Sequence, residues 1–149
     1  MREINFRAWH INERKMYEVK QIDFFFGLAE VQWWEPQPDG SKVLRFKTVT
    51  FTDFEDEDTG VVLEEKEVIL MQYTGLKDKD GKEIYEGDIV RIITGEKGVI
   101  GKVVYNPQKT AFCVEAKGFE TFSLGFLSIF FKVVVLGNMY ENPELLKEV

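Results

Sequence analysis

Tyr85-Glu-Gly-Asp-Ile-Val-Arg-Ile-Ile93 is the stretch of the chain that decides its fold. Successive side chains of a strand point to opposite faces, so Ile89 and Ile93 share one face while Val90 and Ile92 share the other. A strand with apolar residues on both faces is covered on both sides. We therefore expect a buried strand here, with other strands packed around it.

Further short strands follow this stretch. Glycines at 95, 98 and 101 punctuate the link to a strand that ends at Tyr105, and Asn106-Pro107 turns the chain into Ala111-Phe-Cys-Val-Glu-Ala116. Phe130 to Leu136 is a last apolar strand, and Asn142-Pro143 is placed to start a terminal helical turn. Short strands at this spacing predict a small barrel with little helix.

Turn signals divide the part of the chain that precedes Tyr85. Asp80-Gly81 between polar arms predicts a hairpin. Residues 3–11 alternate and, with Lys15 to Val19, predict a second one. Glu35 to Gly40 predicts a turn, and residues 42–52 and 61–71 read as strands around an acidic loop. Residues 23–34 fit a strand or a short helix equally well, because Phe24-Phe25-Phe26 and Trp33-Trp34 are contiguous apolar groups.

Composition excludes several classes of protein. The 149 residues are 44% hydrophobic with 21 aromatic side chains, so a packed core is expected and a disordered chain is excluded. The chain has one cysteine and one histidine, which are too few to form a zinc finger, an iron-sulfur site or an internal disulfide. The chain shows no signal peptide and no membrane-spanning stretch, so we expect a cytoplasmic protein that avoids the membrane.

Charge is distributed unevenly along the chain. Residues 1–70 carry 9 basic and 15 acidic side chains, whereas residues 71–149 carry 10 and 11, within a net charge of -7. This difference predicts an acidic N-terminal β segment over residues 1–70 and a C-terminal barrel over residues 71–149. An acidic protein repels phosphate backbones, so nucleic acid is a disfavoured partner.

Three parts of the sequence resemble the YopX family of phage and prophage proteins. The longest is Leu70-Met-Gln-Tyr-Thr-Gly-Leu-Lys-Asp-Lys-Asp-Gly-Lys-Glu-Ile-Tyr-Glu-Gly-Asp-Ile-Val90, and the others are Phe6-Arg-Ala-Trp9 with Lys15-Met-Tyr17 and Leu136 to Leu146. Together they extend the resemblance over residues 1–149. It implies a phage or prophage origin, hence a bacterial host cytoplasm, a mainly β fold and self-association, and it carries no established activity.

A second resemblance concerns residues 87–104, which are similar to the KOW-type segment of SH3-like barrels in ribosomal and transcription-elongation proteins. Under this interpretation Arg91, Lys97 and Lys102 would meet phosphates. The competing interpretation is that the glycines allow the tight turns of a small barrel. The acidic neighbours Asp88 and Glu96 favour the second interpretation.

Other candidate sites have simpler explanations. Asp53 to Asp58 lacks the glycine of a calcium loop, and Asp78, Asp80 and Glu83 are accounted for by the Asp-Gly hairpin, so no metal or cofactor is expected. His10 could serve as a base and Cys113 as a nucleophile, but Cys113 lies in an apolar strand with no sign of an activating environment, so both are interpreted as structural and no catalytic residue is assigned. For the aromatic residues at 24–26 and 33–34, burial in a core or a subunit interface is favoured over base stacking.

The sequence thus predicts a mainly β, non-enzymatic protein. We expect a homo-oligomeric protein-binding module with itself and an unidentified protein as partners. A nucleic-acid-associated regulator that uses Arg91, Lys97 and Lys102 is the alternative.

Overall fold

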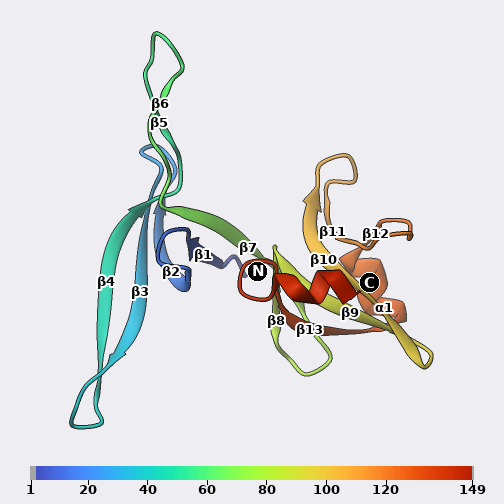
Figure 1. Cartoon of the computed structure of the whole chain (residues 1–149). Coiled ribbons are helices and arrows are strands. Elements are labelled where there is room, and N and C mark those ends of the chain that lie inside the picture. Colours follow the sequence, from blue (N-terminus) through green and yellow to red (C-terminus); the bar gives the residue numbers. More distant parts are fainter. Residues whose placement is uncertain (1–2, 149) are drawn as a thin grey trace. The chain divides into compact units, whose positions relative to one another are not determined.

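The structure, a computed structural model, describes residues 3–148 (Figure 1). The chain divides into two compact units. We call Asn5–Met71 the N-terminal unit, and residues 72–148 together with residues 3–4 the C-terminal unit. Both units consist mainly of antiparallel strands, as the sequence predicts.

The N-terminal unit is built on a six-stranded sheet in the order β4-β3-β2-β1-β7-β8, of which β8 (Glu83–Tyr85) belongs to the C-terminal unit. Its strands are β1 (Phe6–His10), β2 (Lys15–Asp23), β3 (Leu28–Pro36), β4 (Lys42–Thr50) and the first part of β7 (Val68–Lys77). The predicted first hairpin is confirmed, with Ala8 opposite Tyr17. Six buried residues form the core of this unit: Ala8, Tyr17, Ala29, Val31, Val49 and Val68.

Residues 23–34 form a turn followed by a strand, which settles the choice between strand and helix. The Asp23 carboxylate accepts hydrogen bonds from the backbone N–H groups of Phe25 (3.0 Å) and Phe26 (3.1 Å). Gly27 then adopts a φ of 67°, which favours glycine, and β3 begins at the next residue. Phe24 to Phe26 therefore occupy the turn, while Trp33 and Trp34 alternate within β3.

The strand expected over residues 61–71 is wrong as a continuous element. Its first part, β6 (Val62–Glu64), pairs with β5 (Phe54–Glu55) in a separate two-stranded hairpin, and β7 begins only at Val68. Between them Lys66 donates its backbone N–H to the Asp53 carboxylate (2.8 Å), and Glu67 donates to the Thr50 carbonyl (3.0 Å). These bonds close the base of the hairpin, which projects as a narrow ribbon (Figure 1).

The C-terminal unit holds a five-stranded antiparallel sheet in the order β12-β11-β10-β9-β13. Its strands are β9 (Asp88–Thr94), β10 (Lys97–Asn106), β11 (Ala111–Glu115), β12 (Phe122–Ser123) and β13 (Lys132–Asn138). Within residues 3–148 the predicted small barrel does not close, because the edge strands β12 and β13 of this sheet do not pair with each other. The mainly β prediction is confirmed, and the sheet is open.

A short helix, α1 (Leu124–Phe130), stands where no helix was expected. Ser123 caps it by accepting a hydrogen bond from the Phe126 N–H (3.2 Å). The strand predicted from Phe130 therefore begins at Lys132. The apolar run over residues 126–136 overlaps both α1 and β13, and hydrophobicity alone does not mark the boundary between them.

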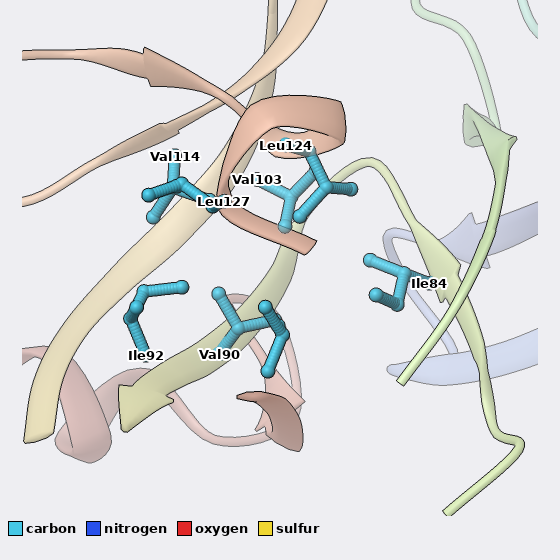
Figure 2. Close-up of a cluster of buried hydrophobic side chains, with 8 residues drawn as sticks. Ile84, Val90, Ile92, Val103, Val114, Leu124 and Leu127 are labelled. Carbon is cyan, nitrogen blue, oxygen red and sulfur yellow. The ribbon is translucent and has the colours of Figure 1, made fainter. Parts of the chain in front are cut away.

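The core of the C-terminal unit lies between α1 and the sheet. Figure 2 shows Leu124 and Leu127 of the helix beside Val103 and Val114 of β10 and β11. Val90 and Ile92 come from β9, so the stretch that decides the fold supplies the centre of this core. The other buried members are Ile84 and Val133.

Glycines of β10 serve close packing more than turning. Gly95 has a φ of 65° in the β9–β10 turn, as a tight turn requires. A Cβ atom at Gly101 would lie 2.6 Å from the Glu115 carbonyl oxygen and 2.7 Å from the Val114 side chain. Gly101 thus allows β11 to approach β10, a role that the sequence interpretation did not include.

The Asp80-Gly81 hairpin is present between the end of β7 and β8 (Glu83–Tyr85). Gly81 has a φ of 84°. The chain ends in a 3₁₀ helix, η1 (Pro143–Glu148), at the predicted position. Asn142 precedes it, but its side chain accepts a hydrogen bond from the Asn138 N–H (3.2 Å) instead of capping the helix.

Candidate functional site

The three basic residues of the nucleic-acid alternative do not form one site. Ile89 and Arg91 are two residues apart in β9, so their side chains point to the same face of the sheet. Lys102 of β10 is paired with Ile89 and points to that face as well. Lys97 begins β10 opposite Thr94, at the far end of the β9–β10 hairpin and in the other phase of the alternation. Two of the three residues are therefore brought together.

Lys102 belongs to the lining of a surface cleft. Lys102 and Lys117 line it with Glu115, and Ile100, Ala116, Thr121 and Leu146 complete its wall. Its volume is about 390 Å³. The Lys102 Nζ lies 3.8 Å from a Glu115 carboxylate oxygen, while the Lys109 Nζ donates to the Thr121 carbonyl at 2.8 Å. We call this the lysine cleft. It combines positively charged side chains with apolar wall residues.

Sequence reasoning missed the lysine cleft because its parts come from separated segments. Lys117 follows β11, and Leu146 belongs to η1, which packs against β10. Lys132 was also missed, although it stands opposite Ile93 and therefore lies on the same face as Arg91. Only the pairing of β13 with β9 reveals that position.

An exposed row of aromatic rings lies on α1 and just before it. The rings of Phe122 and Phe126 stack with centroids 5.5 Å apart, and those of Phe126 and Phe130 lie 4.8 Å apart. Residues four apart on a helix are neighbours on its surface, which explains the contact between Phe126 and Phe130. Phe126 is 45% exposed and Phe130 is 65% exposed. We call these three residues the aromatic row.

An apolar cavity of about 210 Å³ adjoins the aromatic row. Phe122 belongs to both, and Phe119, Phe131 and Leu127 line the cavity with residues of the sheet. Thr94 and Glu120 are the polar side chains in its lining. This surface can receive an apolar side chain, since exposed apolar patches rimmed by polar groups mark interaction sites.

Burial of Phe24 to Phe26 in the core of the chain, one of the two predicted locations, is wrong. All three are exposed, Phe25 to 89%, because the Asp23-capped turn carries them beyond the end of the sheet. Trp33 contacts Tyr17 with ring centroids 5.4 Å apart, whereas Trp34 on the opposite face of β3 is exposed. Burial of these rings in a subunit interface stays a prediction.

The acidic run forms part of a structured hairpin. The Asp56 carboxylate accepts hydrogen bonds from the backbone N–H groups of Asp58 (3.0 Å) and Thr59 (2.9 Å) and from the Thr59 hydroxyl (3.0 Å). The Thr59 N–H and hydroxyl and the Asp58 N–H lower the pKa of Asp56 by stabilising its charged carboxylate. Among the described residues, no group of three or more His, Cys, Asp or Glu side chains is arranged to hold a metal ion.

Asp78 has a structural role in the β7–β8 turn. Its carboxylate accepts hydrogen bonds from the backbone N–H groups of Asp80 (2.8 Å), Lys82 (2.9 Å) and Val135 (3.0 Å). Burial by itself would raise the pKa of Asp78, but these three bonds hold that pKa below its ordinary value. The carboxylate therefore joins the turn to β13.

The two candidate catalytic side chains lie in structural surroundings. Cys113 is fully buried in β11, and burial raises the pKa of its thiol, which disfavours the reactive thiolate. His10 is also buried; its Nδ1 accepts a hydrogen bond from the Glu13 N–H (3.1 Å), and its Nε2 lies 3.6 Å from a Glu13 carboxylate oxygen. The Glu67 carboxylate lies 3.7 Å from the same Nε2, so the ring is held between two glutamates and a turn of its own segment.

Comparison with known proteins identifies the family. The model of the YopX protein family matches residues 5–147, so the chain belongs to the YopX family. A crystal structure of protein EF1440 from Enterococcus faecalis is similar over 98% of this chain and 99% of its own, with 26% identity and a TM-score of 0.60. A comparison with curated proteins found no match.

The structure of the protein yopX from Bacillus subtilis is a second similar structure. It shares 20% identity with this chain, covers 97% of each chain and has a TM-score of 0.53. At this identity the similarity concerns the fold alone. In the described part of the chain, moreover, none of the helices is long and apolar enough to cross a membrane.

Proposed function

We propose that this chain is a non-enzymatic, phage- or prophage-encoded module that binds protein and associates with copies of itself in the cytoplasm of a bacterial host. The observation that carries the proposal is the aromatic row with its adjoining apolar cavity. Aromatic side chains are enriched at protein interfaces, where burial of each ring contributes a large apolar area. A protein partner could cover these rings and place an apolar side chain in the adjoining cavity.

The unreactive surroundings of Cys113 and His10 support a binding role. A buried thiol with a raised pKa is a poor nucleophile, and a buried histidine whose Nδ1 accepts a hydrogen bond from its own turn is poorly accessible to a substrate. The open sheet supports self-association, because unpaired strand edges are ready to pair or to be covered.

Sedimentation velocity over a range of protein concentrations tests the proposal. We expect the wild type to sediment as an oligomer at tens of micromolar and the double variant F126S/F130S to dissociate at least tenfold more readily. Both rings are exposed, so the fold should tolerate the change, and circular dichroism checks that it does. The variant F24S/F25S in the β2–β3 turn tests in the same way whether those exposed rings belong to the interface as well. A monomeric wild type would contradict the proposed self-association.

Nucleic-acid binding is the alternative, and one observation favours it. Arg91, Lys102 and Lys132 lie on one face of the C-terminal sheet, where they could contact phosphates together. Glu115, which lies beside Lys102, opposes this role.

A further inference from the structure

We propose that the lysine cleft of one copy receives the β5–β6 hairpin of a second copy. This inference rests on the self-association proposed above and identifies a second contact that would contribute to it beside the aromatic row. One surface belongs to the C-terminal unit, and the other belongs to the N-terminal unit of the second copy.

The negative charge of the N-terminal unit is concentrated in the hairpin. Residues 53–66 contain seven carboxylates and one lysine, whereas the rest of Asn5–Met71 contains seven acidic and seven basic side chains. The net charge of -6 on this unit therefore comes from the hairpin. We call residues 53–66 the acidic hairpin.

The acidic hairpin also exposes apolar side chains that nothing in its own two strands can bury. Phe54, Val61, Val62 and Leu63 are all exposed. An isolated two-stranded hairpin has marginal stability, and packing against another surface is the usual remedy. The acidic hairpin thus presents both carboxylates and apolar groups to a complementary site.

The lysine cleft has the complementary composition. Lys102 and Lys117 provide positive charge that Glu115 only partly offsets, and Ile100 and Leu146 provide apolar wall. Lys109 lies beside the cleft through its bond to the Thr121 carbonyl. Opposite charges arranged in this way increase the association rate and fix the register of an interface.

A hairpin of a second copy fits this cleft better than a nucleic acid does. Phosphates would satisfy the lysines but would leave Ile100 and Leu146 without an apolar partner. The acidic hairpin supplies both kinds of contact, and it accompanies every copy of the chain. Because the two surfaces differ, the contact is heterologous, which produces a ring if the rotation closes and a filament if it does not.

Charge reversal with rescue tests the inference on the full chain. The hairpin variant E57K/E64K avoids Asp53 and Asp56, whose carboxylates hold the local backbone, and the cleft variant is K102E/K117E. We expect each to weaken self-association at least tenfold in sedimentation velocity. The quadruple variant combines both reversals and should restore association, because its hairpin and cleft are again complementary. Association of the wild type should also weaken as salt is raised.

A control variant, E30K/E96K, changes the net charge as much as E57K/E64K does but lies outside the acidic hairpin, and it should associate like the wild type. Thermal unfolding followed by circular dichroism identifies any variant that has lost its fold. The inference is wrong if the wild type associates and neither charge reversal weakens that association. It is also wrong if the quadruple variant is folded but fails to associate. In both cases the proposed self-association still stands. If the wild type is monomeric, self-association itself fails.

A second measurement distinguishes binding of the hairpin in the lysine cleft from binding of nucleic acid there. Labelled single-stranded RNA is titrated with the wild type and with K102E/K117E. RNA binding that K102E/K117E abolishes, together with unchanged self-association in that variant, would assign the cleft to nucleic acid and overturn the inference. Absence of RNA binding, together with the charge-reversal rescue, supports it.

Discussion

The carboxylate of Asp78 joins three backbone positions, two in its own turn and one in β13. Substitution of Asp78 by alanine would remove the acceptor of these three N–H groups, and each lost hydrogen bond costs about 0.5–1.5 kcal/mol because the donors of the exposed residues Asp80 and Lys82 can bond to water instead. We expect D78A to lower the free energy of unfolding by about 3 kcal/mol in urea denaturation. The matched control is D80A, whose side chain only pairs with Lys79 at the surface, and it should change stability by less than about 0.5 kcal/mol.

The same residue should produce a pH dependence. The pKa of Asp78 is lower in the folded chain than its ordinary value of about 3.9 in the unfolded chain. Its contribution to stability is therefore fully present above that ordinary value and is lost as the pH falls through the lowered pKa. The stability difference between wild type and D78A should shrink as unfolding is measured at progressively more acidic pH. A difference that grows on acidification would contradict the role given to Asp78.

At the scale of elements, helix α1 depends on its cap more than on its length. Seven residues form too short a helix to be stable alone, so the Ser123 cap and the packing of Leu124 and Leu127 hold it. We expect S123A to lower the free energy of unfolding by about 1 kcal/mol.

Ser128 of the same helix is a matched control for Ser123. Its hydroxyl oxygen is buried and has no hydrogen-bond partner among residues 3–148. Removing an unpaired buried hydroxyl costs no hydrogen bond, so S128A should leave stability unchanged or raise it by up to about 1 kcal/mol in the same urea experiment. Equal destabilisation by S123A and S128A would show that capping does not account for the helix.

At the scale of the whole molecule, the net charge of -7 opposes nucleic-acid binding although Arg91 and Lys102 share a face. A variant in which Arg91, Lys97 and Lys102 are all alanine separates local attraction from overall repulsion. Under the proposed function, neither wild type nor variant should bind labelled single-stranded DNA, duplex DNA or RNA at two salt concentrations. Binding that falls steeply with salt and disappears in the variant would support the alternative.

Much of the fold was predictable because strands and turns are encoded locally. Alternation over residues 3–11, the Asp80-Gly81 turn and the doubly apolar stretch Ile89 to Ile93 each depend on neighbours in the sequence, and each is confirmed. Helix α1 was not predictable in the same way. Its run of apolar residues fits a strand as well, and the Ser123 cap is a weak signal without the packing of Leu124 and Leu127 against the sheet.

The sequence by itself determined the mainly β class, the two segments of different charge and the family to which the chain belongs, since these depend on composition, local pattern and motif. Only the tertiary structure decided which side chains meet. Strand pairing places Arg91 beside Lys102 and separates Lys97, and the packing of η1 on β10 brings Leu146 to the lysines of the cleft. Such contacts join residues far apart in the chain, and a one-residue change of strand register would exchange their faces.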